Sequence, residues 1–149
     1  NYADDGRLYV YIIKYTNNHG GENMILNGSN TLRKPSIIND TEFQNLVTWT
    51  EAKIEDYLRK GHRSFTVKDL FGVSHWDWSS NKYPIQILYY RWREKYEVEN
   101  PYLSQDELSQ KAYDAAGVAV GHIIKQACFR SQRKFRITKE FRITRYYEV

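Results

Sequence analysis

The residues of this chain best suited to chemistry are the basic side chains near its C-terminus. The stretch KFRITKEFRITRYY, residues 134–147, repeats Phe-Arg-Ile-Thr and places an arginine between apolar neighbours. Lys and Arg side chains on one surface bind the phosphate groups of nucleic acids, and the resulting affinity depends strongly on salt. The pattern therefore predicts a surface that contacts a polyanion.

The positive charge is concentrated at one end of the chain. Residues 1–116 hold 14 Lys and Arg against 16 Asp and Glu, a net charge of −2, whereas residues 117–149 hold eight against two, a net charge of +6. This asymmetry is typical of a nucleic-acid-binding surface. The alternative explanation is that these cations only keep the protein soluble. We expect the nucleic-acid contacts to come from His122, Lys125, Arg130, Arg133, Lys134, Arg136, Lys139, Arg142, Arg145 and Tyr146.

The repeat predicts a β-hairpin over residues 134–147. A three-residue loop at residues 138–140 sets Ile137 opposite Phe141 and Phe135 opposite Ile143, so that apolar residues share one face. A two-residue loop at residues 139–140 would mix core and solvent residues, and we therefore prefer the longer loop. Because that loop has no glycine, one long strand stays an alternative.

In the preferred register, Arg136 lies opposite Arg142. Like charges directly across two strands cost some tenths of a kcal/mol, which a bound anion would offset. The following Tyr146 and Tyr147 would stack on unpaired bases. The alternative explanation is structural, because arginines on an exposed strand also prevent edge-to-edge aggregation and tyrosines also pack in cores.

No other residues have the spacing of a catalytic or metal site. Ser74 and Asp77 flank a histidine in SHWDW, but a catalytic triad is recognised by its geometry in space. Cys128 lies on a small-residue stripe and is expected to fill the core. The remaining candidates are isolated histidines, which are expected at the surface: His19, His62, His75 and His122. We therefore expect a non-enzymatic protein without cofactor or metal.

The composition indicates one domain in a reducing compartment. The 149 residues are 41% hydrophobic, which suffices for one core. A single cysteine cannot form an intrachain disulfide, and no stretch reaches about 18 consecutive apolar residues. With no signal-like start, we expect a cytoplasmic protein that does not bind membranes.

Two capping patterns predict the first helices. Asn39 and Glu42 form a capping box that starts a helix over residues 40–60, and Gly61 is placed to end it. A short strand over residues 64–66 follows. Thr66 then caps a second, very short helix over residues 67–71.

A helical segment over residues 84–116 comes next, followed by a helix over residues 117–129. Pro84 suits the first turn of the segment, and Ser104 with Glu107 forms another capping box. The run AAGVAVG, residues 115–121, is unusually small-chained. Either Gly117 is the turn of a helix-turn-helix, or the small residues let another backbone approach closely.

Together these elements predict an α+β fold, a winged helix-turn-helix. A long helix, a short strand and a short helix start the core, residues 117–129 supply the recognition helix, and residues 134–147 supply the wing. Residues 73–116 are expected as a helical insertion. Residues 1–38 are expected as an N-terminal β accessory, with a strand over 8–16 and a second one within 22–30.

Three stretches carry a family resemblance. KGHRSFTVKDLFGVSHW (residues 60–76), VGHIIKQA (residues 120–127) and RYY (residues 145–147) resemble a family of small proteins from Gram-positive mobile elements. That family is a domain of unknown function found beside replicative helicases on staphylococcal-type cassette elements. The resemblance covers about a third of the chain and implies a winged helix associated with single-stranded DNA.

The expected function is binding of single- or double-stranded DNA in the maintenance, replication or regulation of a phage, plasmid or cassette element. A host or replication protein is a further expected partner. The alternative is a phage or plasmid protein that binds and inhibits a host protein, through the aromatic-rich surface between Trp76 and Trp92.

Overall fold

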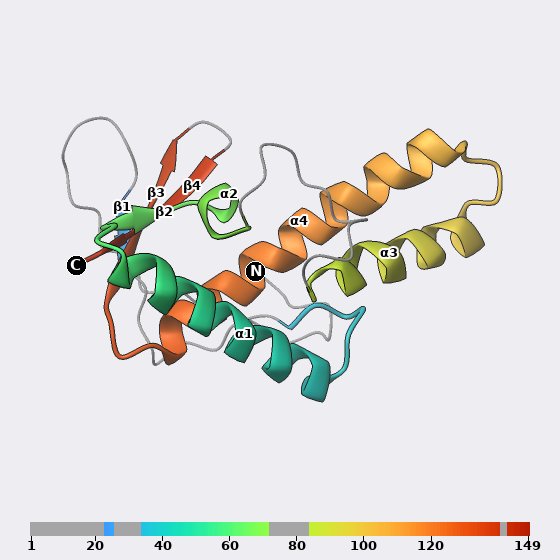
Figure 1. Cartoon of the computed structure of the whole chain (residues 1–149). Helices are drawn as coiled ribbons and strands as arrows, with labels where there is room; N and C mark the ends of the chain where they lie inside the picture. The colour runs from blue at the N-terminus through green and yellow to red at the C-terminus, as the bar shows by residue number, and fades with distance from the viewer. Residues whose placement is uncertain (1–22, 26–33, 72–83, 141–142) are drawn as a thin grey trace.

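The computed structural model describes residues 23–25, 34–71, 84–140 and 143–149, which form an α+β fold (Figure 1). Its elements in chain order are β1 Asn23–Ile25, α1 Asp40–Arg59, β2 Ser64–Phe65, α2 Val67–Phe71, α3 Gln86–Glu99, α4 Gln105–Arg130, β3 Phe135–Glu140 and β4 Ile143–Glu148. None of the helices in these ranges is long and apolar enough to cross a membrane. The predicted helices 40–60 and 67–71 are confirmed to within one residue.

Side-chain caps explain where α1 begins and ends. The N–H of Glu42 donates to Asn39 Oδ1 at 2.8 Å, and the N–H of Asn39 donates to Glu42 Oε1 at 3.0 Å. These bonds satisfy donors that the first helical turn leaves unpaired. Gly61 has a φ of +98°, which favours glycine directly after the helix. The predicted capping box and stop are both confirmed.

A similar pair of side-chain hydrogen bonds caps the start of the short helix α2. The N–H of Thr66 donates to Asp69 Oδ2 at 2.8 Å, and the N–H of Asp69 donates to Thr66 Oγ1 at 3.3 Å. This reciprocal pair turns the chain directly from β2 into α2. The predicted strand over 64–66 is one residue shorter in the structure, because Thr66 serves as the cap.

Helix α4 is continuous through Gly117 and runs from Gln105 to Arg130. Its capping box forms as predicted, with Ser104 Oγ accepting from the N–H of Glu107 at 3.2 Å. The predicted break at Gly117, between an insertion ending at 116 and a separate helix over 117–129, is wrong. One buried stripe passes through Gly117, because Ala116 before it and Val120 after it are both fully buried.

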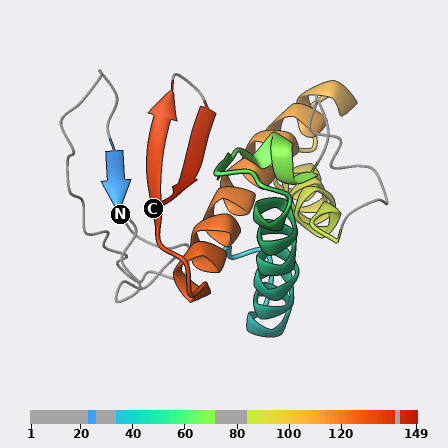
Figure 2. The same cartoon turned by 60° about the vertical axis from the view of Figure 1, so that its left-hand side comes forward.

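Helix α4 is the central element of the core. It packs against α1 and α3, and α1 and α4 both lie on one side of the sheet (Figure 2). Several of its buried residues are alanines. The prediction that the small residues of this segment let another backbone approach closely does not hold at Gly117 and Gly121, because a Cβ atom at either position would meet nothing within 4 Å. Buried aromatic and aliphatic residues of the strands complete the cluster, including Phe65, Phe135 and Ile137.

The four strands form one antiparallel sheet in the order β1-β3-β4-β2. β3 and β4 form the predicted C-terminal hairpin, and β2 pairs with β4 at one edge. At the other edge β1 pairs with β3, with Met24 opposite Ile137. The N-terminal region therefore contributes a strand, as expected. The strand predicted over 8–16 and the loop predicted over 73–81 lie outside the described residues.

The predicted register of the hairpin is wrong. Residues 138–140 belong to β3 and do not form the loop, since Glu140 lies opposite Ile143, and Ile137 lies opposite Tyr146. Arg136 accordingly lies opposite Tyr147, and the predicted pair with Arg142 does not form. In this register the large ring of Tyr146 enters the core, whereas Ile143 stays 48% exposed. Burial of an aromatic ring removes more apolar surface from water than burial of an isoleucine, which favours this register.

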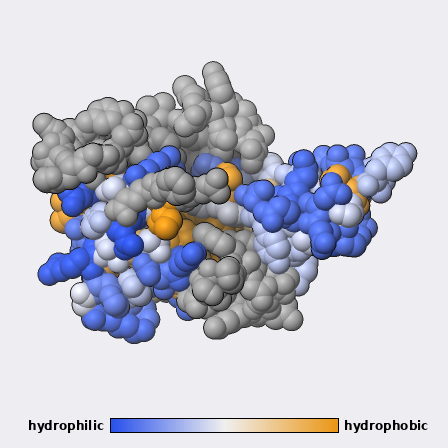
Figure 3. Space-filling model, turned by 90° about the horizontal axis from the view of Figure 1, so that it is seen from above, coloured by the Kyte–Doolittle hydropathy of each residue, from blue (hydrophilic) through white to orange (hydrophobic). Residues whose placement is uncertain are grey.

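Helices α3 and α4 form an antiparallel hairpin that projects from the body, which we call the arm (Figure 1). Both aromatic and aliphatic side chains pack within it: Tyr89 stacks on Tyr113 at 4.6 Å between centroids, and Leu88 and Leu108 are buried. Arg91 ties the arm to α1 through paired hydrogen bonds to Glu42, which lower the pKa of that carboxyl. The far end of the arm has a mostly hydrophilic surface, on the right of Figure 3.

Candidate nucleic-acid interface

Arg133 is held by two carboxylates. Its Nε donates to Glu55 Oε1 at 2.7 Å, and its Nη1 also pairs with Glu148. The hydrogen bond from Arg133 lowers the pKa of the Glu55 carboxyl, and both bonds raise the pKa of the arginine. Arg133 thereby joins α1 to the last strand. Its charge is balanced, which leaves it a structural role in this arrangement.

Arg130 and Arg145 also face carboxylates. Arg130 Nε lies 2.8 Å from Glu51 Oε1, on α1. Arg145 Nη1 lies 3.8 Å from Asp69 Oδ2 and donates to Ser64 Oγ at 3.3 Å. Both arginines are therefore partly neutralised by residues that lie far away in the sequence.

Tyr146 is a core residue and cannot stack on a base in this structure. Its side chain is 1% exposed and stacks on Phe65, with 5.1 Å between ring centroids and 15° between ring planes. The prediction that Tyr146 contacts nucleic acid is therefore wrong. The cause is the register of β4, which directs Tyr146 toward the same face as Phe135 and Ile137.

Lys125 and Lys139 are brought together from two elements. Lys125 lies on α4 and is half-buried, and Lys139 lies on β3 in the same alternation as the buried Phe135 and Ile137. Burial lowers the pKa of Lys125, and the positive charge of Lys139 lowers it further. His122 precedes Lys125 by three residues and shares its side of the helix.

The other predicted cations lie apart from this pair. Arg136 is on the opposite face of the sheet, where its guanidinium lies 5.0 Å from the ring centroid of Tyr147. Lys134 is exposed before β3, about 17 Å along the strand from Lys139 at roughly 3.3 Å per residue. Arg142 lies outside the described residues. The single track of cations predicted from the sequence is therefore divided.

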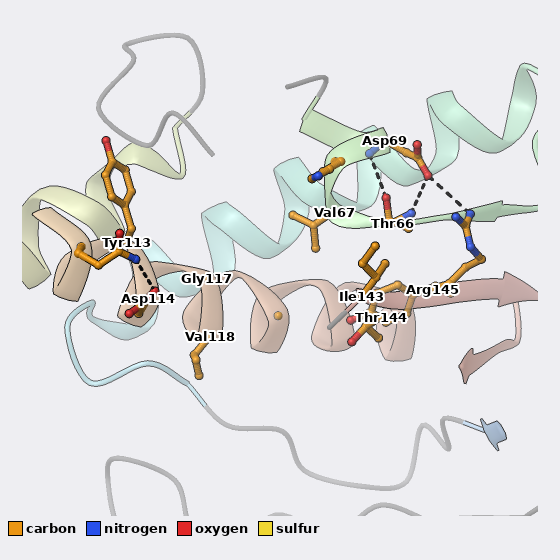
Figure 4. A pocket seen from close by; sticks show the side chains of 14 residues that line it. Thr66, Val67, Asp69, Tyr113, Asp114, Gly117, Val118, Ile143, Thr144 and Arg145 are labelled. Atoms are coloured by element: carbon orange, nitrogen blue, oxygen red, sulfur yellow. Dashed lines mark hydrogen bonds and ion pairs between the residues drawn. The ribbon is translucent and has the colours of Figure 1, made fainter. Parts of the chain in front are cut away.

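A groove that the sequence did not indicate lies between α2, α4 and the start of β4 (Figure 4). Its volume is about 720 Å³. Gly117 and Val118 form part of one wall, and Ile143 to Arg145 form another. The only signal of this groove in the sequence is the small-residue run of α4, which leaves room beside the helix.

The residues of the alternative protein-binding surface are only partly described. Trp76 and Trp78 lie outside the described residues. Trp92 is half-buried, stacks on Tyr96 at 5.4 Å between centroids, and carries the ammonium of Lys95 at 4.9 Å from its ring centroid. This aromatic cluster has a packing role within the arm.

Cys128 has the packing role predicted for it. It is buried on α4, and burial raises the pKa of its thiol, which disfavours the nucleophilic thiolate. Across residues 23–25, 34–71, 84–140 and 143–149, no three His, Cys, Asp or Glu side chains gather as metal ligands would.

Comparison with known proteins adds no relative to this description. No protein-family model matches the chain, and no curated protein or solved structure is significantly similar to it. A function for this chain is therefore inferred from the geometry of the residues described above.

Proposed function

We propose that this protein binds nucleic acid without catalysing a reaction, and that Lys125 and Lys139 form the centre of its phosphate-binding surface. The observation that carries the proposal is the position of the two lysines on adjoining elements: Lys139 lies opposite Thr144, Lys125 is one turn after Gly121, and Thr144 and Gly121 line the same groove. Consistent with this, the charge of Lys139 adds to burial in lowering the pKa of Lys125. Two like charges held together repel each other, and a phosphate between them replaces that repulsion with two charge-assisted hydrogen bonds.

The order of the elements supports the same proposal. α1, β2 and α2 precede α4 and the β3–β4 hairpin, and β2 pairs with β4, so the hairpin lies beside α4 as a wing would. We infer a winged-helix arrangement in which the C-terminal half of α4 and the hairpin face the nucleic acid. The arm stands where a winged helix has a short turn between its second and third helices, so this chain would be an elaborated version of the fold.

The ion pairs of the arginines limit the expected footprint. Arg130, Arg133 and Arg145 already pair with carboxylates, and a phosphate would have to displace these partners. Two lysines contacting about two phosphates would give a slope of roughly −2 in a plot of log affinity against log salt for a duplex. We therefore propose weak, salt-sensitive binding of the DNA of a mobile element, aided by a replication or host protein.

The test is the binding of short labelled single- and double-stranded DNA by fluorescence anisotropy, at about 50 and 200 mM salt. We expect Lys139→Glu to weaken binding at least tenfold at the lower salt and to reduce the salt slope by about one. The matched control is Lys95→Glu on the arm, which changes the net charge equally and should leave binding unchanged. Absence of binding at low salt, or equal effects of the two reversals, would refute the proposal.

A further inference from the structure

One edge of β4 is only partly covered. β2 pairs with β4 at two positions, Ser64 opposite Tyr147 and Phe65 opposite Tyr146, and the chain then leaves the sheet as α2. β4 begins at Ile143, three residues before the position that Phe65 covers. Among the described strands, none therefore pairs with the first half of β4 on the side of β2.

The backbone groups of Thr144 point toward this uncovered edge. The N–H of Glu148 donates to the carbonyl of Arg63, next to β2, at 3.0 Å, whereas the N–H of Val149 donates to the carbonyl of Lys134, next to β3, at 2.8 Å. Backbone groups of successive residues in a strand point to opposite sides. Thr144 has the same parity as Glu148, so its N–H and its carbonyl are directed away from β3.

The groove described above opens at this edge (Figure 4). Val118 and Ile143 line it with side chains that are 63% and 48% exposed. The helix wall contains Gly117 and Gly121, at which a Cβ atom would meet nothing within 4 Å, so the groove has room next to the backbone of α4. An extended segment beside β4 would cover both exposed side chains.

The charges of the groove are balanced. Among the described residues that line it, two are basic and two are acidic: Lys68, Arg145, Asp69 and Asp114. Arg145 and Asp69 also pair with each other across the groove wall. These described lining residues offer a phosphate backbone no excess of positive charge, whereas Lys139, opposite Thr144 on the neighbouring strand, belongs to the adjoining surface with Lys125. The lining instead matches an uncharged ligand with backbone-like hydrogen-bonding groups.

We propose that this groove binds an extended, uncharged polypeptide segment, which adds to β4 as an antiparallel strand in line with β2. The segment would donate to the carbonyl of Thr144 and accept from its N–H, as an added strand does at a sheet edge. Side chains on the face of the segment toward α4 would lie against Val118, and those on its other face would lie against Ile143. This binding site adjoins the proposed nucleic-acid surface, because Lys139 lies directly opposite Thr144 in the hairpin. Its hydrogen bonds would form at the edge of β4 that faces away from β3, so the proposal does not depend on nucleic-acid binding.

The test uses the substitution Thr144→Pro. Proline removes the outward N–H but leaves the β3–β4 ladder intact, because the backbone groups of Thr144 face away from β3. Thr144→Ala is the matched control, since it keeps the N–H and removes only the side chain. The probe is a capped peptide of alternating valine and threonine, about six residues long, the ordinary length of a strand.

Binding is followed by NMR on the ¹⁵N-labelled full chain. We expect the peptide to slow solvent exchange of the Thr144 amide and to shift the signals of Val118 and Ile143. Thr144→Ala should bind within about twofold of the unsubstituted protein, and Thr144→Pro should bind about fivefold more weakly, the typical effect of one hydrogen bond.

Four results would overturn the proposal: a Thr144 amide already protected in the free protein, no change at that amide with peptide, equal binding by the proline variant, or DNA shifting the groove signals in place of the peptide. If the proline variant fails to fold, solvent exchange at Thr144 in the unsubstituted protein, with and without peptide, decides the question. Loss of DNA binding in Lys139→Glu with peptide binding retained would show that the two sites are independent.

Discussion

Replacing Gly117 and Gly121 by alanine tests whether α4 is a single helix. Both glycines lie inside the helix, and a Cβ atom at either position would meet nothing within 4 Å. A glycine inside a helix destabilises it by roughly 0.5 to 1 kcal/mol relative to alanine, mainly through the entropy of the unfolded chain. We therefore expect each substitution to raise the free energy of unfolding by that amount, and the double variant to gain about 1 to 2 kcal/mol.

The assay is urea unfolding followed by circular dichroism at the helix band. The midpoint should rise in both single variants while the slope with denaturant stays unchanged, because the surface exposed on unfolding is the same. The melting temperature of the double variant should rise by roughly 2 to 8 °C for a chain of this size. Gly61→Ala is the matched control and should lose stability, because the φ of Gly61 is +98°.

The sign of the Gly117→Ala effect separates two structures of this segment. If Gly117 were the turn of a helix-turn-helix, alanine there would be strained and would destabilise the protein, as at Gly61. A lower midpoint for Gly117→Ala together with a higher one for Gly121→Ala would refute the continuous helix. The same result would restore the turn that the sequence suggested.

Three further substitutions or reactions test the core and the ion pairs. Phe65→Ala should cost about 3 to 5 kcal/mol in urea unfolding, because Phe65 is fully buried between Phe135 and Tyr146, and a loss below 1 kcal/mol would contradict that packing. The pKa of Glu55 in the folded protein lies below its ordinary value of 4.5, so the stability from its pair with Arg133 is complete above that pH and is lost as the pH falls through the folded pKa. Glu55→Gln should remove this part of the acid sensitivity in thermal melts, and an unchanged pH dependence would show that the pair adds nothing. The Cys128 thiol should react with a thiol reagent only after denaturant is added, and rapid reaction of the native protein would contradict its burial.

The helix starts could be predicted because their signals are local. Asn39 with Glu42 and Ser104 with Glu107 are three residues apart, and each pair bonds to backbone groups in its own turn. Such caps depend on few distant contacts. The short helix after β2 was predictable for the same reason, from Thr66 and Asp69.

The register of the hairpin could not be predicted, because it depends on β2. Phe65 lies opposite Tyr146 and stacks on it, and this contact joins residues 81 positions apart in the sequence. The repeat of Phe-Arg-Ile-Thr suggested that its apolar residues pair with each other. In the structure the register is instead the one that buries the ring of Tyr146 in the core, and it leaves Ile143 half-exposed.

That the basic side chains do not form one continuous surface could not be predicted either, because this too depends on contacts between residues far apart in the sequence. Glu51 and Glu55, which pair with Arg130 and Arg133, lie on α1, and Asp69, which faces Arg145, lies on α2. Arg133 pairs in addition with Glu148 of β4. A count of charges over residues 117–149 assumes that all of these arginines can bind a phosphate. Only the packing of α1 and α2 beside the C-terminal strands shows which charges are balanced within the protein.

The continuity of α4 has a mechanical consequence. The helix has 26 residues and is therefore about 39 Å long at roughly 1.5 Å per residue. It begins at the tip of the arm, forms a wall of the groove and carries Lys125 near its other end. Because the helix is not interrupted between these points, a force applied to the arm would move the groove wall and Lys125 together, as one rigid body.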